Sequence, residues 1–402
     1  MAVSGLTAAR ELRLSELAPR TLQSEIRAMT MECDRIGGVN LAQGVCDTEP
    51  PAEVLAAAIE AIEAGHNIYT RLDGIARLRE AIAAKMVRDR GIVVDPNSEV
   101  LVTSGATGGL NAAAAALLDP GDEVILFEPF YGYHASELKS KRMVPVIVPL
   151  TPPISADADW TLDMDAVRAA VTDKTRAMIV NTPSNPAGKI FTRAELAALA
   201  ELAVERGLFV FTDEIYEHFV YAKADGGSEH VSMASLPGMR ERTIVISGFS
   251  KTFSVTGWRL GYLVADAKWL GAISYFHDLT YVCAPSAFQH GAAAGLEKLG
   301  PEFYTALATD HLAKRAKIVA ALDAAGMKAY VPRGAYYVLA NASHLPGETA
   351  AKKARWLLAE TGVASVAGSA FFRAGGGEDL LRFCFAKRDA DLADACARLG
   401  RL

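Results

Sequence analysis

The sequence has no long hydrophobic segment and no block of positive charge. Its longest apolar stretches are much shorter than the ~18 residues that a membrane-spanning helix requires. The N-terminal segment MAVSGLTAARELRLSEL lacks the apolar core of a secretion signal. We therefore expect a cytoplasmic protein without a membrane partner. The formal net charge is −6, which argues against a nucleic-acid-binding surface and favours small-molecule partners.

Cysteine is scarce as well. The five cysteines are scattered along the chain, are odd in number and never have the spacing of metal ligands or of a redox pair. This pattern predicts reduced thiols, as in a cytoplasm, and no metal site. Repeats and low-complexity tracts are also absent, which argues against a solenoid or a long disordered linker.

The chain has 402 residues, of which 51% are hydrophobic and 22% charged. This is an ordinary globular composition, and the length exceeds what one hydrophobic core usually serves, so we expect two structural domains. We predict an N-terminal arm with part of a small domain at 1–45, a large domain at 46–290 and the rest of the small domain at 291–402.

Short apolar runs recur through the middle of the chain, and alanine-rich segments with helical spacing separate most of them. This alternation predicts a mostly parallel α/β sheet whose strands are buried on both faces. After about residue 290, longer helices with a few strands predict a smaller α+β domain. The runs begin at residues 99, 123, 144, 177, 208, 243 and 259, and read EVLVTSG, EVILFEP, VPVIVPL, AMIVNTP, LFVFTDE, TIVISGF and RLGYLVA.

Polar residues follow these runs, at the sheet edge where α/β proteins bind ligands. The turn at Gly105, Ala106 and Thr107 opens a helix and would seat a phosphate on backbone N–H groups. Tyr131 offers an aromatic face, and Asn185 an amide. Each residue alone has a simpler explanation in tight packing or turn chemistry.

Acidic and basic groups follow the next runs. Asp213 stands at the end of an apolar run with Tyr216 close behind; its simplest role would be to cap a helix. In SGFSKTFSVTGWRLGY, residues 247–262, Lys251 follows another run, and Arg259 could hold an anion with two hydrogen bonds. Pyridoxal 5′-phosphate needs this combination, because it takes a Schiff-base lysine, an acidic partner for its ring nitrogen and a phosphate seat.

Four ordered segments, NTPSNPAG, TDEIYEH, SGFSKTFSVTGWRLGY and LLRFCFAK, resemble the signatures of class I/II aminotransferases, which are fold type I pyridoxal-phosphate enzymes. The resemblance covers nearly the whole chain. It implies a large domain built on a mostly parallel seven-stranded sheet and a smaller α+β domain. The segments VNLAQGVCDTEPP, YTRLDGIARLREAI and FCFAK are similar to the kynurenine, glutamine and methionine aminotransferase group.

The resemblance implies catalytic roles for three residues. Lys251 would bind the cofactor as a Schiff base and then act as general base, Asp213 would pair with the ring nitrogen, and Tyr216 would hydrogen-bond the ring hydroxyl together with Asn185. Arg382 would clamp the substrate α-carboxylate beside Gly44. The other implied cofactor contacts are Tyr131 on the ring face and, at the phosphate, Gly105, Ala106, Thr107, Ser247 or Ser250, Arg259 and Tyr69 from the partner in a homodimer.

Two departures from the family pattern bear on these roles. Gly248 stands three residues before the lysine, where many relatives carry a phosphate-binding serine, so Ser247 is the expected substitute. VCDTEPP replaces the more usual FPDFPPP, which predicts a different entrance above the substrate.

The implied reaction is ping-pong transfer of an amino group from a neutral or aromatic L-amino acid to a 2-oxo acid such as 2-oxoglutarate. Thr107 stands where some aspartate-type relatives have a lysine, which disfavours an aspartate-type enzyme unless Arg71 faces the pocket. A β-lyase acting on cysteine conjugates and a cyclising lyase remain alternatives on the same scaffold. An effector-sensing domain would need a basic extension, for which we expect no room before residue 20, and a structural oligomer would not need Lys251 beside Asp213.

Overall fold

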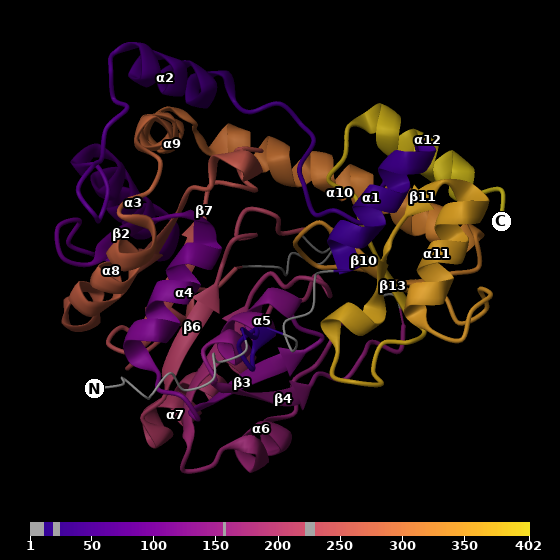
Figure 1. The fold of residues 1–402 in the computed structure, drawn as a ribbon, viewed down its shortest axis with the longest axis horizontal. Coiled ribbons are helices and arrows are strands. Elements are labelled where there is room, and N and C mark those ends of the chain that lie inside the picture. Colours follow the sequence, from indigo (N-terminus) through magenta and orange to yellow (C-terminus); the bar gives the residue numbers. More distant parts are fainter. Residues whose placement is uncertain (1–11, 19–24, 156–157, 222–229) are drawn as a thin grey trace, which may run out of the picture.

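The computed structural model describes residues 12–18, 25–155, 158–221 and 230–402. A seven-stranded sheet forms the centre of the molecule, and its strands coincide with the seven apolar runs (Figure 1). Six strands run parallel, and β8 is antiparallel to both of its neighbours, β2 and β7. The predicted mostly parallel sheet is therefore confirmed. In spatial order the strands are β2 (Val100–Thr103), β8 (Gly261–Val264), β7 (Thr243–Gly248), β6 (Phe209–Asp213), β5 (Thr175–Asn181), β3 (Glu123–Glu128) and β4 (Val144–Pro149).

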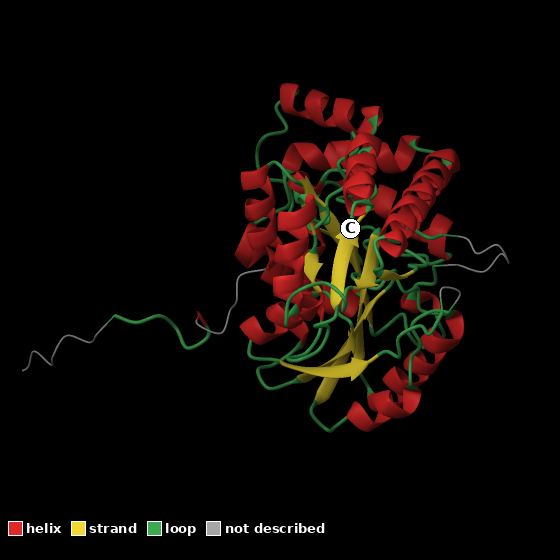
Figure 2. Cartoon of the chain, turned by 90° about the vertical axis from the view of Figure 1, so that its right-hand side faces the viewer, coloured by secondary structure: helices red, strands yellow, loops and turns green. Residues whose placement is uncertain are grey.

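Helices cover both faces of this sheet, because successive strand residues point to opposite sides (Figure 2). Ile244 and Ile246 pack with the helices of one face, and Val245 between them packs with helices of the other. The first face carries α4 (Gly105–Leu117), α5 (Gly132–Ser140) and α8 (Ala267–Tyr281), and the second carries α3 (Ala76–Arg90), α7 (Arg193–Arg206) and α9 (Ser286–Lys298).

Strand β4 departs from the prediction that the strands are buried on both faces. It lies at the end of the sheet order with β3 as its neighbour, and Val144 is 45% exposed. An edge strand is covered by fewer neighbouring elements than a central strand. An apolar run in the sequence does not distinguish an edge strand from a central one.

A smaller antiparallel sheet follows, built from the C-terminal part of the chain. The short parallel pair β1 and β11 ties residues 39–40 to residues 363–364, so the segment before the large sheet packs with the end of the chain. The division at 1–45, 46–290 and 291–402 stays a prediction; residue 290 lies inside α9, which packs on α2 and α3. The elements of this region are α1 (Glu25–Ile36), β1 (Val39–Asn40), α10 (Pro301–Ala324), β9 (Lys328–Tyr330), β10 (Tyr337–Asn341), α11 (Ala350–Thr361), β11 (Val363–Ala364), β12 (Val366–Ala367), β13 (Leu380–Cys384) and α12 (Asp389–Leu399).

One further helix, α2 (Ala52–Glu63), packs on α9 (Figure 1). Three short 3₁₀ turns link other elements in the described ranges, at Met233–Ser235, Thr256–Trp258 and Gly368–Phe371. None of the helices in the described ranges has the length and apolarity to span a membrane.

A buried cluster of charged groups lies behind the segment that follows β6. Glu217 accepts hydrogen bonds from Lys85 Nζ at 2.7 Å, from Arg90, from Ser247 Oγ at 3.0 Å and from Tyr262 Oη at 3.1 Å. Burial alone would raise the pKa of the Glu217 carboxyl, but Lys85 and Arg90 hold this pKa well below its usual value. The cluster therefore depends on a carboxylate that stays charged.

Glu214 belongs to the same cluster and accepts from Ser232 Oγ at 2.7 Å and lies 3.0 Å from His230 Nε2. Its backbone N–H donates to Ile246 O at 2.8 Å. The carboxylates and histidines here are close enough to surround a metal ion, but Lys85 and Arg90 already pair with them. The network instead fixes the backbone from residue 213 to 217, which carries Asp213 and Tyr216.

Glu217→Gln should lower the free energy of unfolding by about 3 kcal/mol, because it keeps the shape of the side chain but leaves buried Lys85 and Arg90 without their shared counter-charge. Urea denaturation followed by circular dichroism would measure the change. Glu205→Gln is the matched control, since Glu205 forms an exposed ion pair with Arg168 and its loss should leave the free energy of unfolding nearly unchanged. Equal midpoints for the two variants would contradict a structural role for the buried charge.

Candidate active site

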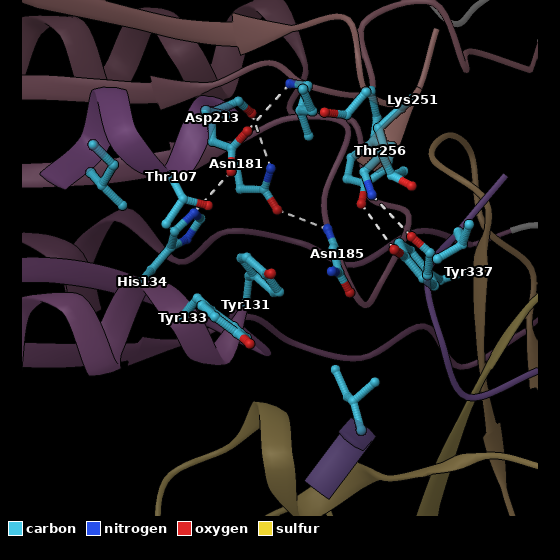
Figure 3. A pocket seen from close by; sticks show the side chains of 18 of the residues that line it. Thr107, Tyr131, Tyr133, His134, Asn181, Asn185, Asp213, Lys251, Thr256 and Tyr337 are labelled. Carbon is cyan, nitrogen blue, oxygen red and sulfur yellow. Dashed lines mark hydrogen bonds and ion pairs between the residues drawn. The ribbon is translucent and has the colours of Figure 1, made fainter. Parts of the chain in front are cut away.

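A cavity of about 630 Å³ lies at the carboxyl ends of β5, β6 and β7. The large sheet and its loops form one side, and α1, the segment 43–45 and residues of β10 and β13 form the other. The structure brings most of the predicted site residues together here (Figure 3). Those that line the cavity are Gly44, Ala106, Thr107, Tyr131, Asn185, Asp213, Tyr216, Ser250, Lys251, Arg259 and Arg382.

Lys251 follows β7, and its side chain enters the cavity. Its Nζ donates a hydrogen bond to Gly44 O at 2.9 Å. Burial lowers the pKa of the Lys251 amine, and the positive charges of Arg259 and Arg382 add to this effect. A larger share of the amine is therefore unprotonated near neutral pH, as a nucleophile or general base requires.

Asp213 stands at the end of β6, with its side chain 14% exposed. His134 Nε2 lies 2.9 Å from Asp213 Oδ2. Asn181 Nδ2 donates to Asp213 O at 3.0 Å, and Asn181 Oδ1 accepts from Asn185 N at 2.8 Å, so Asn181 links the two segments (Figure 3). His134 on α5 thus holds the carboxylate of Asp213, and Asn181 on β5 holds its backbone.

An anion seat lies at the first turn of α4. Gly105 has φ +71°, and a Cβ on it would lie 2.6 Å from Arg259 Nη2, so only glycine lets this backbone approach the guanidinium. Arg259 Nη1 donates to Thr256 O at 3.0 Å. Ala106, Thr107 and the hydroxyl-bearing Ser250 and Thr256 complete this side of the cavity. Helix N–H groups facing a guanidinium suit a phosphate.

Three predicted residues do not line the cavity. Gly105 lies directly behind it, against Arg259. Ser247 is buried within β7 and donates to Glu217, so the structure brings Ser250 and not Ser247 to the anion seat. Tyr69 is 78% exposed on the surface of the single chain. Arg71 also stays outside, where it pairs with Asp73 at 2.7 Å.

Arg382 is buried at the other side of the cavity, on β13. Its Nη1 donates to Asn185 Oδ1 at 3.0 Å and its Nη2 to Ala42 O at 2.6 Å. The guanidinium lies over the rings of Tyr337 and Phe371, 4.3 and 4.8 Å from their centroids. Its Nε, also buried, has no acceptor among the described residues, which leaves donor capacity for a carboxylate.

Two tyrosines connect the sides of the cavity. Tyr216 Oη and Tyr337 Oη are 2.9 Å apart. Burial raises the pKa of Tyr216 well above its usual value, with Tyr337 adding to the effect, so the phenol stays protonated and can donate. Gly44 packs against this pair, because a Cβ at Gly44 would lie 1.9 Å from Tyr337 Oη.

These groups fit pyridoxal 5′-phosphate. The seat at α4 matches its phosphate, the Asp213 carboxylate matches its ring nitrogen, and the Lys251 amine matches its aldehyde. Tyr131, stacked on Tyr133 with ring centroids 5.2 Å apart, offers a ring face.

Several cavity residues were not predicted as site residues from the sequence. His134 lies three residues after the predicted Tyr131 in EPFYGYH, and this proximity could have identified it as a cavity residue. Tyr337 and the α1 residues Arg27 and Thr30 gave no local signal, because long-range packing alone brings them to the cavity.

Comparisons with known proteins agree with this geometry. Residues 36–399 match the family model of aminotransferase class I and II. The structure of N-succinyldiaminopimelate aminotransferase from Mycobacterium tuberculosis is similar, with a TM-score of 0.91 and 37% identity over 97% of this chain and 100% of that one. The structure of YbdL from Escherichia coli, with an identified methionine aminotransferase function, has a TM-score of 0.90 and 32% identity over 98% and 100%.

Among curated relatives, kynurenine–oxoglutarate transaminase 3 of Mus musculus is 34% identical over 90% of this chain and 84% of its own length. The resemblance that the four sequence motifs predicted is therefore confirmed. Relatives named for kynurenine and for methionine are both among the matches.

Gly44→Ala should lower the free energy of unfolding by about 1–3 kcal/mol, because the new methyl group overlaps Tyr337 in a packed interior. Gly257→Ala is a control in the same cavity, since a Cβ there meets no atom within 4 Å. Thermal and urea unfolding of both variants would measure the difference. A Gly44 variant as stable as the Gly257 variant would show that Tyr337 moves aside freely.

Proposed function

The chain belongs to the class I and II aminotransferases, which depend on pyridoxal 5′-phosphate, and on this premise we propose that it moves an amino group from a neutral or aromatic L-amino acid to a 2-oxo acid such as 2-oxoglutarate. The observation that carries the proposal is one cavity lined by Lys251, Asp213 and Arg382. An amine, an acid and a carboxylate clamp are the groups that amino transfer requires from the protein.

When bound, the cofactor supplies an electron-accepting ring that stabilises negative charge developing at the substrate Cα. Asp213 would keep a proton at the ring nitrogen, and His134 and Asn181 hold Asp213 in place for that task. Tyr216 and Asn185 would hydrogen-bond the ring hydroxyl. Gly105–Thr107, Ser250 and Arg259 would hold the phosphate.

Lys251 would hold the cofactor covalently through its amine. With its pKa lowered by burial, the free Nζ would accept the proton from the substrate Cα and return it at C4′ of the cofactor. Arg382 holds the α-carboxylate, with Asn185 and Gly44 at the same end. Arg382 would thereby orient the Cα–H bond toward Lys251. Such positioning of the reacting groups contributes to catalysis.

The lining of the cavity supports neutral or aromatic donors. Ile26, Val45, Tyr131 and Tyr133 provide apolar and aromatic surface. Thr107 places no charge beside the phosphate seat, and Arg71 is engaged by Asp73 outside the cavity. Neither Thr107 nor Arg71 therefore supports an aspartate-type preference.

We also propose a homodimer with shared active sites, working in the cytoplasm. Helices α2 and α8 and the segment between α2 and α3, which contains Tyr69, carry many exposed apolar side chains, as a subunit interface does. The five cysteines are free thiols, as cytoplasmic proteins usually have. The exposed apolar residues of α2, α8 and the segment between α2 and α3 are Leu55, Ile59, Ile62, Ile68, Leu72, Tyr275, Phe276, Leu279, Tyr281 and Val282.

The proposed reaction is tested by incubating the enzyme with a panel of amino acids and 2-oxoglutarate. We expect glutamate to form from neutral or aromatic donors, and the visible absorption band of the bound cofactor to bleach with the same donors. Lys251→Ala should retain cofactor that borohydride no longer fixes to the protein, and should lose at least about a thousandfold in kcat. Ammonia and pyruvate from a cysteine conjugate, without glutamate, would instead identify a β-lyase.

Shared active sites are tested by mixing two weakly active variants. Lys251→Ala and Tyr69→Ala, unfolded and refolded together, should recover about a quarter of wild-type activity, because a mixed dimer contains one site with both residues intact. Lys251→Ala mixed with Asp213→Ala is the control, since both changes fall on the same subunit's site and no intact site forms. No recovery in the first mixture would refute a contribution of Tyr69 from the partner.

A further inference from the structure

The cavity carries more basic than acidic side chains. Of the described residues that line it, Arg27, Lys251, Arg259 and Arg382 are basic, and Asp213 alone is acidic. Such an excess of positive charge fits a cavity whose ligands together carry several negative charges. A basic group without a role in the proposed function is therefore a candidate to bind a further anionic group.

Three of the four basic groups have a role in the proposed function. Lys251 receives the cofactor, Arg259 lies against the phosphate seat at Gly105, and Arg382 faces the α-carboxylate. These contacts account for the cofactor phosphate and one substrate carboxylate. Neither the cofactor phosphate nor the substrate α-carboxylate is assigned to Arg27.

Arg27 lies near the start of α1, exposed at the edge of the cavity. No residue in the described ranges forms an ion pair or a hydrogen bond with its guanidinium. Glu32, farther along the same helix, pairs instead with Arg355 at 3.5 Å. As far as the described residues go, the Arg27 charge is thus available to a ligand.

The packing of α1 shows on which side of the cavity Arg27 lies, and therefore which ligand Arg27 can contact. The helix packs on β1, β11 and β12, and Asn40 of β1 donates to Thr30 at 3.2 Å. Strand β12 pairs with β13 so that Val366 lies opposite Arg382. Arg27 therefore belongs to the side of the cavity that holds Arg382 and the substrate, and not to the sheet side that holds the phosphate seat.

We propose that Arg27 is a specificity-determining residue that binds the distal carboxylate of a dicarboxylic 2-oxo acid, the amino acceptor; this rests on the proposed function. A guanidinium binds a carboxylate with two parallel hydrogen bonds, which favours a dicarboxylic acceptor over a monocarboxylic one of equal length. A neutral donor leaves Arg27 in solvent, because the side chain is exposed, and so avoids the penalty of burying an unpaired charge. One cavity can thereby serve both halves of the reaction.

The test compares Arg27→Gln with Arg35→Gln in the holoenzyme. Arg35 is an exposed arginine on the same helix that does not line the cavity, so its variant controls for loss of charge on α1. We expect Arg27→Gln to raise KM for 2-oxoglutarate by about tenfold or more while KM for 2-oxopentanoate and kcat stay within about twofold. Arg35→Gln should behave as wild type.

A binding measurement without turnover accompanies the kinetics. Isothermal titration of the holoenzyme should show glutarate binding about tenfold or more tightly than pentanoate in the wild type, and this preference should vanish in Arg27→Gln, with Arg27→Lys keeping part of it. Equal glutarate affinity in wild type and Arg27→Gln, or no preference in wild type, would overturn the role of Arg27. Failure of the wild type to transaminate any 2-oxo acid would overturn the proposed function instead, while the titration still decides on Arg27.

Discussion

The hydrogen bond from Arg382 to Asn185 joins the two sheets of the molecule at the cavity. Arg382 lies on β13 of the small sheet, and Asn185 lies in the turn after β5 of the large one. A second contact, from Lys251 Nζ to Gly44 O, crosses between the same two parts. The cavity exists because a parallel sheet gathers the ends of its strands at one edge, and because the segments before and after that sheet close over this edge together.

Local patterns were sufficient to predict the strands and the residues at their ends. Asp213, Asn185 and Lys251 each follow an apolar run, and the parallel arrangement of β5, β6 and β7 brings such positions together without further information. The exposed edge of β4 and the cavity position of Tyr337 were not predictable in this way. Both depend on which elements become neighbours, and that is decided by packing between residues far apart in the sequence. The same holds for α1, whose place follows from the pairing of β1 with β11.

Ser247 and Ser250 were both predicted at the phosphate, and strand geometry places their side chains differently. The family pattern puts a hydroxyl three residues before the lysine, and Gly248 stands there in this chain. A Cβ at Gly248 would lie 2.9 Å from Gly261 Cα, because β7 and β8 approach each other closely at this pair. The adjacent Ser247 points to the opposite side of the strand, where Glu217 accepts its hydrogen bond. Ser250 is the serine of this segment that lines the cavity, so strand geometry rather than residue type decides which hydroxyl faces the phosphate seat.

The segment TDEIYEH has two sides with different tasks. Asp213 and Tyr216 face the cavity, whereas Glu214 and Glu217 enter the cluster of buried charges behind it. A carboxylate that holds one orientation in a cavity needs a backbone that does not move, and a segment between a strand and a turn is not rigid by itself. The buried cluster supplies this rigidity because each of its carboxylates has several partners on different elements. Such a network contributes less to net stability than to fixing a single arrangement, since bringing its charges out of water costs much of what their pairing returns. Because the buried cluster fixes the backbone of Asp213 on the side away from the cavity, the carboxylate can contact His134 and a ligand on the cavity side.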